Sequence, residues 1–168
     1  MIISVSRRTD IPAFYAEWFY NRLRAGYVLV RNPMNVHSVS KVALSPEVVD
    51  AFVFWTKNPL PLIKRLDELA EYPYYFQFTL TGYGKDIEPG LPDKTQALLP
   101  AFKELAAKTG RQRVIWRYDP IFFSSRYSAE YHLECFEVMA AELSGSTERC
   151  VISFMDEYRN TKRNAQKI

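Results

Sequence analysis

The chain has 168 residues, of which 48% are hydrophobic and 24% are charged. A chain of this length can bury a substantial core without disulfides or metals, so we expect one domain spanning residues 1–168. The formal net charge of +3 comes from scattered Lys and Arg rather than from a basic run, which supports nucleic-acid binding only weakly. The Cys and His residues lack metal-ligand spacing, which disfavours a zinc site.

The first apolar run predicts a strand at Ile2–Ser6 and leads directly into Arg7 and Arg8. It is too short for a signal peptide or a membrane span, so we expect a cytoplasmic protein that does not contact membranes. A helix should follow, with Asp10 as its cap and Gly26 as its end. Further predicted strands, rich in β-branched and aromatic residues, are Ala51–Thr56, Tyr74–Thr81, Arg113–Tyr118 and Cys150–Phe154.

Helical patterns fill most of the intervals between these strands. They begin near Pro59–Pro61, near Pro92 and at Ser128, and the last two end at Gly110 and near Gly145. One segment departs from this alternation of strands and helices. Its residues Val28–Arg31 and Val39–Ala43 predict two strands of an inserted hairpin. This hairpin could cover one end of the fold or mediate dimer contacts, and the sequence does not choose between these roles.

Alternating strands and helices predict parallel pairing with right-handed crossovers, in a doubly wound sheet or a barrel. Phe76 and Phe78 alternate with Gln77 and Thr79, so one face of the sheet is polar. This favours a barrel, because helices cover both faces of a doubly wound sheet. A complete eight-unit barrel needs about 250 residues. We therefore predict an α/β fold that is a partial TIM-like (β/α) barrel, with about five parallel strands, helices on the outside and the inserted β-hairpin.

The residues after the last predicted strand are polar and do not read as a covering helix. An uncovered parallel edge invites pairing. We therefore expect either a missing C-terminal half or a second chain to cover this edge, and favour the missing sequence.

Polar side chains follow the predicted strands at the sheet edge where parallel α/β folds bind their ligands. Arginine binds carboxylates and phosphates bidentately, lysine adds a point charge, and a flat aromatic ring can stack on a ligand. We therefore expect a rim that binds a small anionic ligand. Its expected residues are Arg7, Arg8, Trp55, Lys57, Asn58, Gln77, Thr79, Arg117 and Asp119.

Several of these predictions have a purely structural alternative. Asp119 could form an internal ion pair with Arg117 or with Lys57 and bind nothing. Gln77 and Thr79 could hydrogen-bond one another in a packed interior. For Asp10 a helix cap is the favoured interpretation. No residue carries a pattern that identifies a catalytic role or a metal ligand.

Four motifs, read together, resemble a bacterial family of domains of unknown function, number 1848. They are Ser4–Pro12, Val30–Pro33, Phe54–Pro59 and Arg117–Ile121, and the resemblance spans essentially the whole chain. The family is similar to radical S-adenosylmethionine enzymes, with a partial or complete barrel and a C-terminal cysteine cluster able to hold an iron–sulfur cluster. The resemblance implies that this chain is the N-terminal part of a longer protein.

The chain has only two Cys, so it cannot hold a four-iron cluster by the usual thiolates. We therefore expect no cofactor in this chain and no activity from it alone, with S-adenosylmethionine and the cluster bound by the full-length protein. Two alternatives stay open. One is a metal-free barrel that binds or converts phosphorylated or carboxylated small molecules, and the other, less favoured, is a nucleic-acid-binding module.

Overall fold

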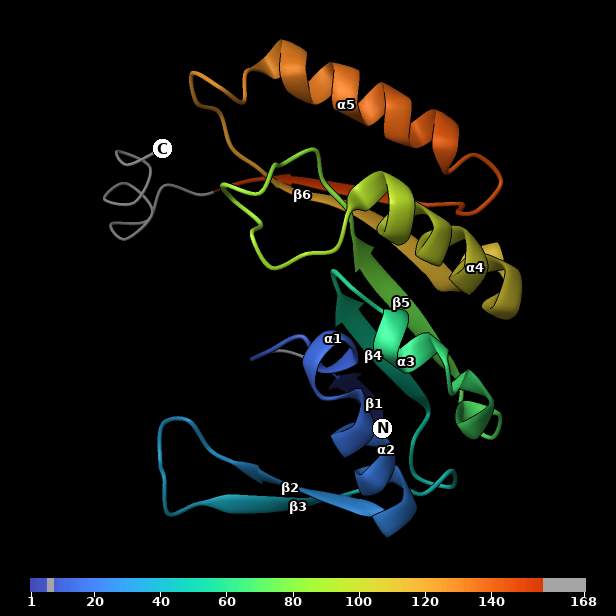
Figure 1. Ribbon diagram of the computed structural model, residues 1–168. Coiled ribbons are helices and arrows are strands. Elements are labelled where there is room, and N and C mark those ends of the chain that lie inside the picture. Colours follow the sequence, from blue (N-terminus) through green and yellow to red (C-terminus); the bar gives the residue numbers. More distant parts are fainter. Residues whose placement is uncertain (6–7, 156–168) are drawn as a thin grey trace. The chain divides into compact units, whose positions relative to one another are not determined.

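The computed structural model describes residues 1–5 and 8–155 of an α/β protein (Figure 1). Its five parallel strands form one sheet in the order β1-β4-β5-β6-β7. The strands are β1 (Ile2–Val5), β4 (Ala51–Thr56), β5 (Tyr74–Thr79), β6 (Val114–Ile121) and β7 (Cys150–Phe154). All five predicted strands are thereby confirmed. The described residues contain no closed barrel.

The chain divides into two compact units, Met1–Phe76 and Gln77–Ile168, with the boundary inside β5. Each unit is described by itself below, and the single domain expected from the sequence stays a prediction. No helix in the described ranges is long and apolar enough to cross a membrane. The cytoplasmic location also stays a prediction.

In the first unit, β1 pairs in parallel with β4, with Ile2 opposite Ala51 and Val5 opposite Phe54. The inserted hairpin is confirmed as an antiparallel pair in which Tyr27 lies opposite Ala43. The remaining elements of this unit are α1 (Ile11–Phe14), α2 (Ala16–Ala25), β2 (Tyr27–Arg31), β3 (Val39–Ala43), α3 (Leu60–Ile63) and η1 (Leu66–Leu69).

The helix expected from Asp10 to Gly26 is present as two helices rather than one. The backbone of Tyr15, at φ −135° and ψ 26°, lies outside the helical region and separates α1 from α2. The predicted ends are confirmed. The Oδ1 of Asp10 accepts a hydrogen bond from the Ala13 N–H at 3.0 Å, and Gly26, at φ 76°, ends α2 in the left-handed region that favours glycine.

Aromatic side chains build the core of the first unit. Phe19 of α2 meets Phe52 and Phe54 of β4 edge to face, with ring centroids 5.5 and 5.4 Å apart. Phe54 also stacks on Phe76 of β5 at 4.9 Å. All four rings are buried. Since alternate residues of a strand point to opposite faces, Val53 and Trp55 lie on the face of β4 turned away from α2.

In the second unit, the described helices are η2 (Lys94–Leu98), α4 (Leu99–Thr109), η3 (Arg111–Arg113) and α5 (Ala129–Glu142). The predicted helix beginning near Pro92 opens with one π-helical turn, η2, capped by Asp93, and then continues as α4. Ser128 caps α5 by accepting a hydrogen bond from the Tyr131 N–H, as the sequence predicts.

The helices of the second unit pack on one face of its strands. Phe102 of α4 stacks on Phe78 of β5 at 5.1 Å, and Phe136 of α5 stacks on Trp116 of β6 at 4.8 Å. Figure 1 shows α5 lying along β6. Since side chains alternate along a strand, Arg117 lies on the opposite face. One face of these strands is therefore apolar and covered by helices, and the other is polar.

Candidate functional site

The polar face of the second unit carries a group of hydrogen-bonded side chains from β5, β6 and β7. Arg117 donates from Nε to Asp119 Oδ1 at 2.9 Å and from Nη2 to Asp119 Oδ2. It also donates from Nη1 to Gln77 Oε1 at 3.3 Å, and Ser153 Oγ donates to Asp119 Oδ2 at 3.3 Å. We call these four residues, Gln77, Arg117, Asp119 and Ser153, the β6 polar cluster.

The ion pair at the centre of this cluster is mostly buried, with 17% of the Arg117 side chain and 11% of the Asp119 side chain exposed. The internal pair between Arg117 and Asp119 that the sequence left open is therefore confirmed. A charge buried to this degree needs a partner, because its lost hydration must be replaced. The pair also holds the guanidinium plane in one orientation.

Thr79 adds a hydroxyl on the same face, because it follows Gln77 on β5 by two residues. The polar face therefore combines guanidinium donors, a carboxylate acceptor and two hydroxyls, from Thr79 and Ser153. Such a set can bind a ligand that carries both an anionic group and a hydroxyl. The ligand-binding roles of Gln77, Thr79, Arg117 and Asp119 stay predictions.

In the first unit, Asp10 links two elements. Besides capping α1, it accepts a hydrogen bond on Oδ2 from the backbone N–H of Lys57 at 2.7 Å. Burial raises the pKa of the Asp10 carboxyl, and its backbone hydrogen bonds act in the opposite direction. The structural role favoured from the sequence is confirmed, and it extends to fixing the turn that follows β4.

The other predicted residues of this unit also take part in local structure. Asn58 Oδ1 accepts from the Leu60 N–H at 3.3 Å, so its side chain supports the start of α3. Arg8 donates from Nη2 to the carbonyl oxygen of Arg31 at 3.0 Å, which ties the segment after β1 to the hairpin. The side chain of Trp55 is half-buried.

Arg7 lies outside the described residues. The predicted ligand-binding residues thus fall into two groups. One group belongs to the first unit and the other to the second, so the single rim that the sequence predicts stays a prediction.

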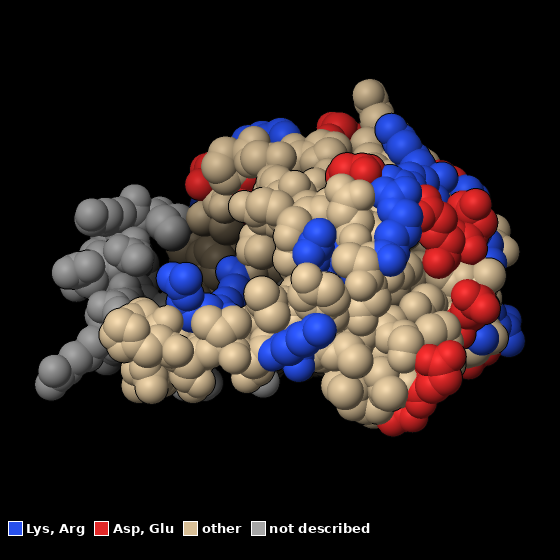
Figure 2. Space-filling model, turned by 90° about the horizontal axis from the view of Figure 1, so that it is seen from below, with Lys and Arg blue, Asp and Glu red and all other residues tan. Residues whose placement is uncertain are grey.

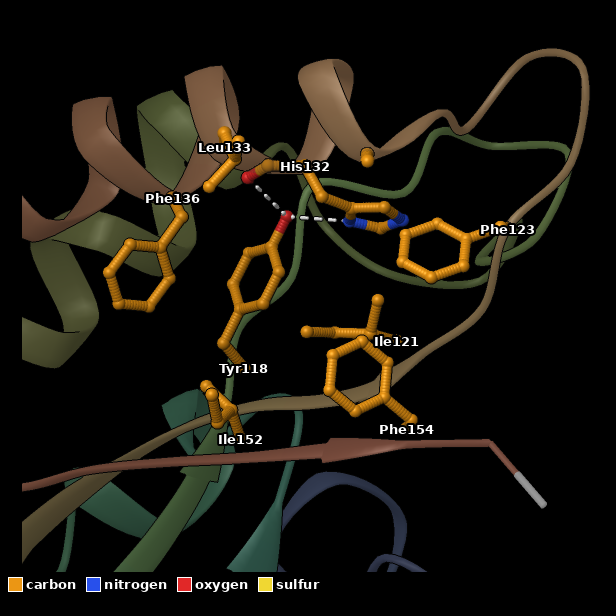
Figure 3. A pocket seen from close by; sticks show the side chains of 9 residues that line it. Tyr118, Ile121, Phe123, His132, Leu133, Phe136, Ile152 and Phe154 are labelled. Carbon is orange, nitrogen blue, oxygen red and sulfur yellow. Dashed lines mark hydrogen bonds between the residues drawn. The ribbon is translucent and has the colours of Figure 1, made fainter.

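A second feature of the second unit is an apolar pocket of about 350 Å³ (Figure 3). Its lining residues come from β6, α5, β7 and the chain between β6 and α5: Tyr118, Ile121, Phe123, Ala129, His132, Leu133, Phe136, Ile152 and Phe154. At its back the Tyr118 hydroxyl lies 3.0 Å from His132 Nδ1, and His132 Nε2 lies 3.1 Å from the Phe122 carbonyl oxygen.

In the neutral His132 ring the proton lies on Nε2, because the Phe122 carbonyl oxygen can only accept. The Tyr118 hydroxyl then donates to Nδ1, and it also lies 3.5 Å from the His132 carbonyl oxygen. Both ring nitrogens are used, which makes His132 a structural residue at the edge of the pocket.

Tyr83 is one of the phenols of this unit whose ionisation should destabilise it at high pH. Its hydroxyl donates to the Pro120 carbonyl oxygen at 2.9 Å and accepts from the Phe122 N–H at 2.9 Å, and burial raises its pKa from 10.0 to about 12. The unfolded chain therefore loses this proton first. The stabilisation is complete below pH 10.0 and is lost as the pH rises through about 12. We expect the melting temperature of the wild type to fall more steeply over this interval than that of Tyr83→Phe.

The measurement is a series of thermal melts between these two pH values, accompanied by tyrosinate absorbance. Tyr15→Phe, which removes an exposed phenol from the first unit, is the control for losing a tyrosine as such. Equal slopes for the wild type and Tyr83→Phe would show that ionisation of this phenol does not contribute to the loss of stability at high pH.

Sequence reasoning missed two parts of the second unit. Ser153 has no motif that distinguishes it from any strand serine, and only the pairing of β7 with β6 places it beside Asp119. The buried ion pair between Lys94 and Glu88 was also missed. Lys94 Nζ contacts Glu88 Oε2 at 2.5 Å and donates to the Thr81 carbonyl oxygen at 2.7 Å. A buried Glu in a loop has no signal in the sequence.

A family model described as a domain of unknown function (DUF1848) matches residues 2–168. The chain belongs to this family. No curated protein and no solved structure matches it. The resemblance found on the four sequence motifs therefore holds at the level of the family.

The cysteines of this DUF1848 chain can be tested against the iron–sulfur cluster that the resemblance implies. Cys135 lies half-buried on α5, and Cys150 is exposed at the start of β7. These are the only two Cys of the sequence, and the described residues contain no group of three or more His, Cys, Asp or Glu arranged to hold a metal. The donors of this chain do not fit a cluster bound by three thiolates.

Proposed function

We propose that this DUF1848 chain binds a small hydroxylated anion, such as a hydroxy acid or a sugar phosphate, at the β6 polar cluster. The observation that carries the proposal is the polarity of one sheet face. Parallel sheets are usually apolar on both faces, because helices cover both. Here α4 and α5 pack against Phe78 and Trp116 on one face, while the opposite face carries an ion pair, an amide and two hydroxyls.

Each side chain has a role that follows from its chemistry. The guanidinium of Arg117 would donate to the anionic oxygens, and Asp119 would accept from a ligand hydroxyl and keep the guanidinium in plane. Gln77 would orient the Nη1 edge of Arg117, with which it is in contact. Thr79 and Ser153 would add hydrogen bonds that favour anions with a hydroxyl group over anions without one.

We further propose that the polar face is the inner wall of a partial TIM-like barrel, which is the architecture expected from the sequence. We also propose, from the resemblance stated in the sequence analysis, that the family is related to radical S-adenosylmethionine enzymes. Because the cysteines of this chain do not fit an iron–sulfur cluster, we assign its residues to ligand binding alone.

Nucleic-acid binding has less support. On the face drawn in Figure 2, basic side chains stand in separate groups, some among uncharged side chains and some beside acidic ones. A nucleic-acid surface normally carries a continuous basic stripe or patch. The charge distribution on this face therefore favours the small-molecule proposal.

The test is a thermal-shift titration of the protein with malate, glycerol 3-phosphate and inorganic phosphate. A ligand that binds only the folded state at one hundred times its Kd stabilises it by about 2.7 kcal/mol, which raises the melting temperature by several degrees. We expect malate or glycerol 3-phosphate to give such a shift and inorganic phosphate to give a smaller one, because phosphate lacks a carbon-bound hydroxyl, separate from the anionic group, from which Asp119 would accept a hydrogen bond.

Matched variants separate binding from folding. Ser153→Ala removes one hydroxyl of the cluster and should weaken binding a few-fold with only a small fall in melting temperature, because Asp119 keeps both contacts with Arg117. Arg111→Met is the control, because it removes an arginine from an exposed ion pair with Glu148 in the same unit. No shift with any of the three ligands, or the same shift in wild type and Arg117→Met, would leave the cluster with a structural role only.

A further inference from the structure

A pocket in the first unit is independent of the β6 polar cluster. It has a volume of about 360 Å³ and is lined by β1, α2, the hairpin strand β2 and the buried ring of Phe52. This volume lies within the range of sites that bind small molecules. Its apolar walls include Ile3, Trp18, Phe19, Val28 and Leu44. The inserted hairpin, which the sequence left without a role, thus forms one wall.

The charged side chains that line this pocket are all of one sign. Among the described residues they are Arg8, Arg22 and Arg31, and no described Asp or Glu lines the pocket. No ion pair of these three arginines is found among the described residues. The pocket is therefore electropositive as well as apolar.

Arg22 has a buried donor atom that lacks a hydrogen-bond acceptor. Its Nε is buried and has no hydrogen-bond partner in the described part of the chain. A buried donor without a partner is costly, at about 1–3 kcal/mol, and is uncommon in native structures. The Arg22 side chain lines the pocket, so its guanidinium can bind an anionic group there, and a change of rotamer would bring Nε to that group.

We infer that this pocket binds a small carboxylic acid with an apolar body. The carboxylate would accept hydrogen bonds from the guanidinium of Arg22, with Arg31 also lining the pocket, and the apolar body would lie against Trp18, Phe19 and Val28. A carboxylate suits the site better than a phosphate, because most of the lining is apolar and, within residues 1–5 and 8–155, one buried donor of the lining lacks an acceptor. The hairpin would act as the cover of the pocket.

Isothermal titration with octanoate tests this inference, and octanol serves as the uncharged partner of the same length. We expect saturable binding of octanoate with a stoichiometry of one, and at least tenfold weaker binding of octanol. Equal affinities for the two would overturn the inference, because they would show that the arginines do not contribute. No saturable binding of octanoate would overturn it as well.

Arginine variants test the position of the site. Arg22→Met keeps the apolar stem of the side chain and should weaken octanoate binding at least tenfold. Arg24→Met is the matched control, because Arg24 lies on the same helix, contacts Asn21 and Glu17, and does not line the pocket. Its affinity for octanoate should equal that of the wild type.

Arg31→Met is the second test if Arg22→Met does not fold, because Arg31 is exposed on the hairpin. It should weaken octanoate binding about threefold and leave octanol binding unchanged. A loss in Arg24→Met as large as that in Arg22→Met, or an unchanged affinity in both Arg22→Met and Arg31→Met, would contradict the assignment. None of these outcomes depends on whether malate binds to the second unit.

Discussion

Replacing Arg117 by Met should lower the free energy of unfolding by about 2–4 kcal/mol, one of the two largest effects that we expect in this chain. The substitution leaves the Asp119 carboxylate mostly buried, with Ser153 as its remaining contact in the β6 polar cluster. A fully buried ion pair loses about 3–5 kcal/mol when one partner is removed, and the partial exposure of this pair reduces the expected loss. Urea denaturation followed by circular dichroism measures it.

The double variant Arg117→Met with Asp119→Leu shows whether the two side chains stabilise the protein through their interaction or independently of each other. It removes both charges and fills the space with apolar groups, so most of the lost stability should return. The coupling energy from the full cycle should be about 1.5–3 kcal/mol. A double variant that is as unstable as the sum of the two single variants would show that the two side chains act independently.

The strands of this chain could be predicted from local patterns alone. Ala51–Thr56 and Cys150–Phe154 are found with the predicted bounds, because β-branched and aromatic residues fit a half-buried strand wherever it pairs. The break at Tyr15 was not predicted. The repeat of apolar residues from Asp10 to Gly26 is continuous, and the backbone change at one residue leaves no trace in that periodicity.

The candidate site, too, has features that the sequence predicts and features that it does not. The alternation along β5 and β6 is local, so the polar face of Gln77, Thr79, Arg117 and Asp119 could be predicted. Whether Arg117 binds a ligand or pairs with Asp119 could not be predicted, because the ion pair depends on the rotamers of these two side chains. The unpaired Nε of Arg22 could not be predicted either, because it depends on how the side chain packs in the folded unit, and no sequence motif indicates it.

The second large effect concerns the aromatic core of the first unit. Phe54→Ala should lower the free energy of unfolding by about 3–5 kcal/mol. Phe54 is fully buried, and its ring contacts Phe19 at 5.4 Å and Phe76 at 4.9 Å. The substitution loses the transfer free energy of the ring and leaves a cavity between α2 and the strands, which the rigid neighbouring rings cannot fill.

Phe14→Ala is the control, because 72% of Phe14 is exposed and its loss should change the stability by less than about 0.5 kcal/mol. Phe19 connects this core to the arginine-lined pocket, since the same ring packs on Phe54 and lines the pocket. A cavity behind Phe19 would let that wall move away from an apolar ligand. Under conditions where Phe54→Ala is folded, octanoate should therefore bind it more weakly than wild type, and an unchanged affinity would show that the pocket does not depend on this core.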